Sequence, residues 1–196
     1  MTILRFSFLV SILLIVSSPA SAQNPGPEFW RRASCEPIEP RTRLEALEQK
    51  YGAVLYKGFA RITTVEITGV RIDAVELRTA TSSERVKGVI VELRAAGNER
   101  QQNRALIDYH EIAPLINALA ELETVDETTT KLANFEAKYR TNGDLEAAIF
   151  RQTRNLTAVT LTTGVCNQVT QTLTIDELQK FRAMISEAKT RLDELK

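Results

Sequence analysis

The residues of this chain best suited to chemistry are its two cysteines. Cys35 and Cys166 are the only cysteines among 196 residues, so one internal pairing exists. An even number of cysteines in an exported chain favours a disulfide, and we predict a Cys35–Cys166 bond. The alternative is two unpaired thiols. In the chain-entropy description, a disulfide that closes so long a loop stabilises the fold by about 4–5 kcal/mol.

The single histidine, His110, lies between two acidic residues, Asp108 and Glu111, which suggests a metal or acid–base cluster. On the first turn of a helix, however, these side chains project in different directions. A zinc site needs three or four ligands, and the chain has no second histidine. Asp108 and Glu111 instead have the spacing of a helix capping box. We therefore predict helix caps and no metal or cofactor site.

No serine of the chain stands in a G-x-S-x-G context, which would mark an activated nucleophile. The eight glycines are mostly single and give no phosphate-binding loop. We predict no catalytic residues and a protein that is not an enzyme. An enzyme whose site is assembled from scattered residues is the alternative that this reasoning leaves open.

The element that organises the rest is a helix expected over residues 174–195. Thr174 and Glu177 have the T-x-x-E spacing of a capping box at its start. Its apolar residues recur in steps of three and four, which places them on one face. They are Leu178, Phe181, Ile185, Ala188, Leu192 and Leu195. This stripe either packs on the strands before it or mediates an oligomer through the C-terminal helix.

The same order of elements occurs twice. A short helix and a strand-rich run precede a first helix within residues 41–123, a polar linker covers 124–131, and a second strand-rich run and helix fill 132–196. Asn142-Gly143 predicts a hairpin in the second unit. We predict an α+β protein of two antiparallel sheet units of about four strands each, each followed by one helix. Whether the units share one sheet is left open.

The N-terminus predicts export. Residues 1–22 combine Arg5, an apolar run from Phe6 to Val16 and the cleavage pattern Ala20-Ser21-Ala22, as in a secretory signal peptide. The alternative is an N-terminal membrane anchor, for which the run is short. We expect a periplasmic or extracellular protein that begins at Gln23 and has no transmembrane span after cleavage.

Residues 23–40 are predicted to form an irregular arm. Five of the six prolines of the chain lie before residue 41. Phe29 and Trp30 are the large apolar residues of this arm. They either attach the arm to the body or serve as a partner anchor.

Charge weighs against nucleic acid and against a charged membrane surface as partners. Without residues 1–22 the chain has 24 basic and 25 acidic residues, so no excess of positive charge attracts a polyanion. A stacking platform for single strands would need Tyr56, Phe59, Tyr139 and Arg140 to come together. We expect them to lie in the core and at its rim instead.

In the order of its elements, the segment 54–195 resembles the ββββα units of the Whirly and PUR nucleic-acid-binding folds. The chain also resembles small secreted bacterial domains of unknown function. The first resemblance implies single-stranded nucleic acid binding, which we keep as an alternative function. Our leading prediction is an exported, non-enzymatic module that binds an envelope or extracellular protein or contributes to envelope structure.

Overall fold

The computed structural model describes residues 39–80, 84–126, 128–132, 134–153 and 156–195. The predicted signal peptide, the proline-rich arm with Phe29 and Trp30, and Cys35 lie outside these residues. The described residues all belong to one compact part of the chain, residues 37–196.

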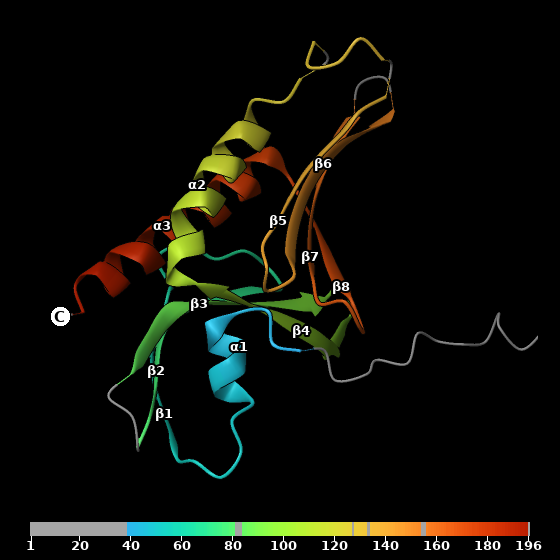
Figure 1. The fold of residues 1–196 in the computed structure, drawn as a ribbon. Coiled ribbons are helices and arrows are strands. Elements are labelled where there is room, and N and C mark those ends of the chain that lie inside the picture. The colour runs from blue at the N-terminus through green and yellow to red at the C-terminus, as the bar shows by residue number, and fades with distance from the viewer. Residues whose placement is uncertain (1–38, 81–83, 127, 133, 154–155, 196) are drawn as a thin grey trace, which may run out of the picture. The chain divides into compact units, whose positions relative to one another are not determined.

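Four antiparallel strands form the first sheet, in chain order (Figure 1). They are β1 (Leu55–Arg61), β2 (Val70–Thr79), β3 (Arg85–Ala95) and β4 (Asn98–Asp108). The central strands are rich in β-branched residues, which suit a pleated sheet that is buried on both faces. The short helix α1 (Arg43–Glu48) packs on one face, and the two longer helices contact the other.

The second sheet repeats this topology. Its strands are β5 (Glu136–Arg140), β6 (Leu145–Thr153), β7 (Leu156–Thr163) and β8 (Val169–Leu173), antiparallel and in chain order. Buried and exposed residues alternate strictly along β8, as expected of a sheet with one face on the core. No pair of strands joins this sheet to the first in the described part of the chain, so the two units form two sheets.

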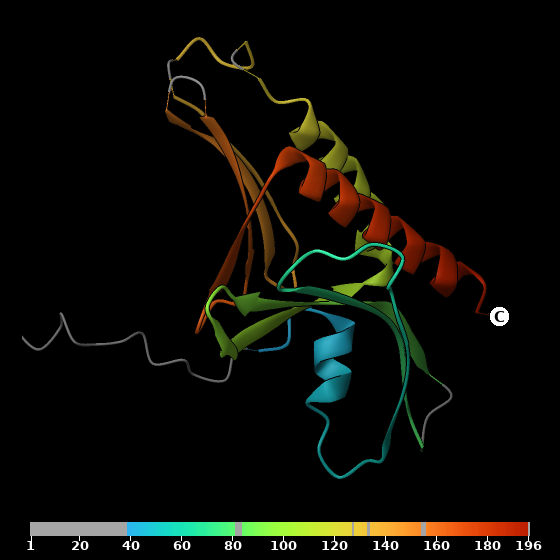
Figure 2. The same ribbon diagram turned by 180° about the vertical axis from the view of Figure 1, so that it is seen from behind.

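Each sheet is followed by one long helix, α2 (Tyr109–Glu123) and α3 (Ile175–Asp193). The two helices lie side by side (Figures 1 and 2). This arrangement confirms the predicted α+β class with two four-stranded sheets. Pro114 is accommodated inside α2 at an exposed position.

Both units contribute to one hydrophobic core. It joins the inner faces of the two sheets to the facing sides of α2 and α3. Phe181 of α3 and Leu119 of α2 are fully buried in it. Five of the six predicted stripe residues of α3 are at most 2% exposed, whereas Leu195 is 42% exposed. The stripe therefore packs inside its own chain and leaves little apolar surface on α3 for the oligomer that we considered.

A second, smaller core lies under α1. Leu44 and Leu47 pack there on the outer face of the first sheet, against residues such as Leu77 and Ile90. Gly88 permits this close approach, because a Cβ at that position would lie 2.6 Å from Leu44 Cδ1 and 2.1 Å from the carbonyl oxygen of Ile107.

Candidate functional site

An alternating chain of acidic and basic side chains crosses the first sheet. Asp73 accepts hydrogen bonds from Nε of Arg61 and Nε of Arg71, both at 3.1 Å. Glu92 accepts from Nη1 of Arg71 at 3.3 Å and from Nη2 of Arg94 at 3.1 Å. Two carboxylates thus hold three guanidinium groups in one row, which we call the arginine row (Arg61, Arg71, Arg94).

The sheet register explains the row. Arg61 lies directly opposite Asp73, and Arg71 lies directly opposite Glu92. Residues two apart on a strand share a face, so Asp73 and Arg71 point to the same side, as do Glu92 and Arg94. Asp73 is 5% exposed and Glu92 is 9% exposed. The buried acids therefore have partners, and the arginines fixed above them reach solvent.

The guanidinium groups keep donors for a ligand. Among the described residues, Arg61 donates through Nε alone, so Nη1 and Nη2 are available. The same is true of Nη2 of Arg71 and Nη1 of Arg94. The three side chains are between 35% and 49% exposed. Planar guanidinium forks of this kind match carboxylate and phosphate groups.

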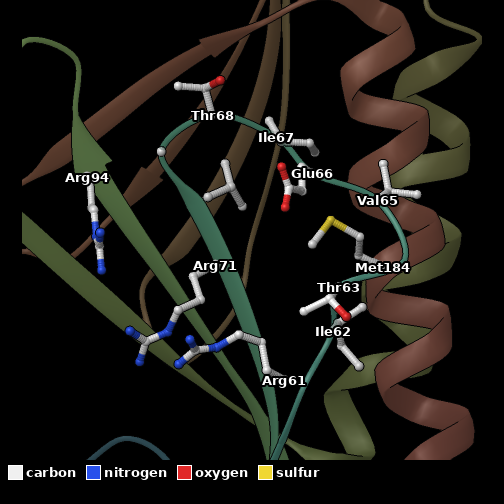
Figure 3. A pocket seen from close by; sticks show the side chains of 12 residues that line it. Arg61, Ile62, Thr63, Val65, Glu66, Ile67, Thr68, Arg71, Arg94 and Met184 are labelled. Carbon is white, nitrogen blue, oxygen red and sulfur yellow. The ribbon is translucent and has the colours of Figure 1, made fainter.

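The arginine row lines a hollow of about 550 Å³ beneath the loop between β1 and β2 (Figure 3). The hydroxyl-bearing residues Thr63 and Thr68 also line it, together with Glu66 and Met184. The loop is tied to the sheet, since the backbone N–H of Arg94 donates to the carbonyl of Gly69 at 2.9 Å. The side chain of Gln171, from β8, donates to the carbonyl of Arg94.

Two more cations lie on the same face of the sheet. Glu48 of α1 accepts from Nη2 of Arg104 at 2.7 Å and from Nζ of Lys57 at 3.3 Å. The ring of Phe59 is 65% exposed beside them on β1. Together with the arginine row, these ion pairs join five cations to three acids, Asp73, Glu92 and Glu48.

The predicted capping box of Asp108 and Glu111 does not form, because both carboxylates serve other elements. Asp108 makes no side-chain bond to its own helix. It accepts from the backbone N–H groups of Arg43 at 2.8 Å and Leu44 at 3.1 Å, at the start of α1. Glu111 accepts from the backbone N–H of Asn142 at 2.9 Å, in the turn between β5 and β6.

Glu111 also affects a neighbour in the second sheet. Its second carboxylate oxygen is buried and has no hydrogen-bond partner in the described part of the chain. Burial of the Tyr139 phenol, and then the nearby charge of Glu111, raise the pKa of Tyr139.

His110 is exposed and lies outside both sets of interactions. It lines a smaller hollow of about 260 Å³ with the basic residues Arg43, Arg85 and Lys87. The described residues contain no group of three His, Cys, Asp or Glu side chains that could hold a metal ion.

The two remaining predicted features are separate from the arginine row. Thr174 and Glu177 form both reciprocal hydrogen bonds of a capping box at the start of α3. Cys166 lies in the turn between β7 and β8 rather than on a strand, and Asn103 of β4 donates to its carbonyl at 2.9 Å. Because Cys35 is outside the described residues, the disulfide stays a prediction.

The stacking platform considered from the sequence is not assembled. Tyr56 and Phe59 point to opposite faces of β1, since they are an odd number of residues apart on a regular strand. Tyr139 is half-buried against the main core, and Arg140 pairs with Asp144 at 2.8 Å. Sequence reasoning missed the arginine row, although the alternation of Arg71 and Asp73 marks one of its arginines and one of the acids that hold it.

Comparison with known proteins adds no relative: no protein-family model, curated protein or solved structure matches the chain. Within the described ranges, no helix has the combined length and apolar character that crossing a bilayer demands.

Proposed function

We propose that the protein is an exported, non-enzymatic binding module that holds an anionic group of its ligand on the arginine row. The observation that supports this most directly is the pair of buried carboxylates, Asp73 and Glu92, which position three guanidinium groups at one hollow. The bound group is a carboxylate or a phosphate, because both accept two parallel N–H bonds from a guanidinium fork.

The engagement of the two buried acids by the arginines supports binding of a compact anion. Asp73 and Glu92 are already engaged by the arginines, whereas Glu66 stands on the exposed loop at the hollow. A small anion can therefore reach the outward Nη atoms without displacing a buried acid. Exposed guanidinium groups are screened by salt, so the affinity should fall as ionic strength rises.

Calorimetric titration of the purified protein, expressed from the full chain, with inorganic phosphate and with citrate tests the proposal. We expect saturable binding of at least one anion. Arg61→Gln and Arg94→Gln should each weaken it about tenfold, the loss expected for one charge-assisted hydrogen-bonding group. Arg78→Gln is the matched control, because Arg78 is exposed on the opposite face of the same sheet and stacks on Tyr56.

Two results would contradict the proposal. One is that neither anion binds at low salt. The other is binding that Arg61→Gln, Arg94→Gln and Arg78→Gln change to the same extent, since that pattern belongs to non-specific attraction. Export is tested separately by fractionation and by the mass of the recovered chain, which should begin at Gln23.

Single-stranded nucleic acid is the second candidate, and one observation favours it. Phe59 lies exposed on β1 between Lys57 and Arg61, which combines a stacking ring with two cations on one face. Titration with a thymidine oligomer distinguishes the two candidate functions. Phe59→Ala should weaken binding of the oligomer and leave binding of the small anions unchanged. Equal binding of the oligomer by the wild type and by Phe59→Ala would contradict a role of Phe59 in binding single-stranded nucleic acid.

A further inference from the structure

Within the residues that the structure describes, the strand β1 is an open edge of the first sheet. Six of its seven residues are exposed, and β2 pairs with it on one side. Half of the exposed large hydrophobic side chains in the described part of the chain lie in or just before β1: Tyr51, Val54, Tyr56 and Phe59, at 96%, 62%, 48% and 65% exposure. An apolar edge strand is a template for pairing with another strand.

The pairing with β2 fixes which backbone groups are free. The N–H of Ile62 donates to the carbonyl of Ile72, and the N–H of Ala80 donates to the carbonyl of Val54. Hydrogen-bonded positions alternate along an antiparallel strand, so the even-numbered residues of β1 bond to β2. Leu55, Lys57, Phe59 and Arg61 therefore direct their N–H and C=O groups to the open edge.

We propose that β1 pairs antiparallel with β1 of a second copy of this chain, about a two-fold axis at Gly58. The free backbone groups require odd-numbered residues to face odd-numbered residues. With the axis at Gly58, Lys57 faces Phe59 of the second copy, and Leu55 faces Arg61. Each cation then lies beside an aromatic or aliphatic side chain, a favourable cross-strand pair.

Charge excludes the neighbouring registers. An axis at Phe59 would place Lys57 opposite Arg61 of the second copy, and an axis at Lys57 would place the two Lys57 residues opposite each other. Like charges directly opposite one another destabilise a strand pair. The axis at Gly58 is the register near the middle of β1 that avoids such pairs.

Side-chain size favours the same register on the other face of β1. There Tyr56 faces Ala60 of the second copy, and Gly58 faces Gly58, so each large ring lies beside small residues. The space at Gly58 is open, because a Cβ there would have no heavy atom closer than the carbonyl oxygen of Glu76 at 3.9 Å. The pairing would join the first sheets of the two copies into one sheet of eight strands.

Light scattering coupled to size exclusion tests the dimer over a range of protein concentrations. We expect twice the chain mass for the wild type and for Lys57→Ala. Lys57→Pro should be monomeric, because proline removes the outward N–H of residue 57 and leaves the even-numbered bonds to β2 intact. Circular dichroism of Lys57→Pro checks that the fold is retained.

Crosslinking tests the register of the β1–β1 pair, and this test does not depend on whether Lys57→Pro folds. Gly58→Cys should form a disulfide-linked dimer under mild oxidation, because two non-hydrogen-bonded residues facing each other have Cα atoms about 4.5 Å apart. Phe59→Cys should not, since the two Phe59 residues do not face each other. A monomer at every concentration, a dimer of Lys57→Pro as stable as that of Lys57→Ala, or faster crosslinking of Phe59→Cys would each overturn the proposal.

Discussion

The carboxylate of Asp108 accepts a hydrogen bond from the backbone N–H of Leu44 at 3.1 Å, across 64 positions of the chain. Asp108 is the last residue of β4 and is 4% exposed. It also accepts from the N–H of Arg43, so it satisfies two amide groups at the start of α1 that the helix itself leaves unbonded. The end of the first sheet thereby fixes the helix that precedes the sheet.

Asp108→Ala should therefore destabilise the protein, although its own helix α2 loses no side-chain cap. It leaves one buried and one partly buried N–H group without their charged acceptor, and we expect a loss of about 3 kcal/mol in the free energy of unfolding. Urea denaturation of the wild type and the variant measures this loss. Asp126→Ala is the control, because Asp126 is exposed and bonds only within its own loop in the described structure. Equal losses in the two variants would contradict the role of Asp108.

The two predicted capping boxes show how far a short-range rule extends. Thr174 and Glu177 form theirs at the surface, where no other donor of the described residues engages either side chain. Asp108 and Glu111 have an equivalent spacing, but both are buried among elements remote in sequence. Spacing predicts that such residues cap helices or turns. Spacing cannot predict which helix or turn each residue caps, because that choice depends on the tertiary contacts.

Gly143→Ala should destabilise the protein by steric conflict rather than by backbone conformation. A Cβ at Gly143 would lie 1.8 Å from the carbonyl oxygen of Leu106, so the turn between β5 and β6 would have to move off β4. We expect a loss of about 3 kcal/mol, the upper range of overpacking.

Gly97→Ala is the matched control for Gly143→Ala. Gly97 has a φ of +74° and no atom within 4 Å of its would-be Cβ. Only the left-handed backbone opposes the substitution, at a cost of about 1 kcal/mol. Thermal unfolding of the two variants measures the difference, and Gly143→Ala should have the lower melting temperature. If Gly97→Ala were the more damaging of the two, the close contact of Gly143 with β4 would be in error.

The positive φ in the hairpin illustrates the same limit of local rules. Asn142-Gly143 predicts the turn, and β5 and β6 pair on either side of it. The left-handed residue is nevertheless Asp144, with a φ of 62°. Gly143 is needed for its missing side chain against Leu106. The arginine row escaped prediction for a related reason: alternation places Arg71 and Asp73 on one face, but their partners depend on registers set by the loops.

Tyr139 should make the protein less stable at alkaline pH. Its pKa is raised in the folded state, first by burial and then by the charge of Glu111. Above pH 10, near the ordinary pKa of tyrosine, the unfolded chain releases this proton while the folded chain retains it. The unfolded state then binds fewer protons, so stability falls as the pH rises through the folded-state pKa.

Denaturation between pH 8 and pH 11 measures this contribution of Tyr139 around its ordinary pKa of about 10. Tyr139→Phe keeps the ring and removes the proton, so the difference in unfolding free energy between the two proteins isolates the phenol from the lysines that titrate nearby. We expect the wild type to lose more stability than Tyr139→Phe over this interval. Parallel curves would show that the phenol does not titrate differently in the two states.

The Cys35–Cys166 disulfide remains the chemical prediction of greatest consequence, and hydrogen bonds of the described residues link Arg41 to the strand end just before Cys166. Arg41 donates to the carboxylate of Asp144 at 2.5 Å, and the carbonyl of Asp144 accepts from Gly164, two residues before Cys166. Cys35 precedes Arg41 by six residues, which can span about 20 Å when extended.

Alkylation of the unfolded protein without reductant measures the pairing. We expect no thiol to react until a reductant is added, and we expect reduction to lower the free energy of unfolding by up to about 4–5 kcal/mol. Cys166→Ser should have the stability of the reduced wild type, because both lack the same crosslink and retain the hydrogen bond from Asn103 to the backbone of residue 166. Two reactive thiols per chain under oxidising conditions would refute the bond and leave the proline-rich arm without a covalent tie to the turn between β7 and β8.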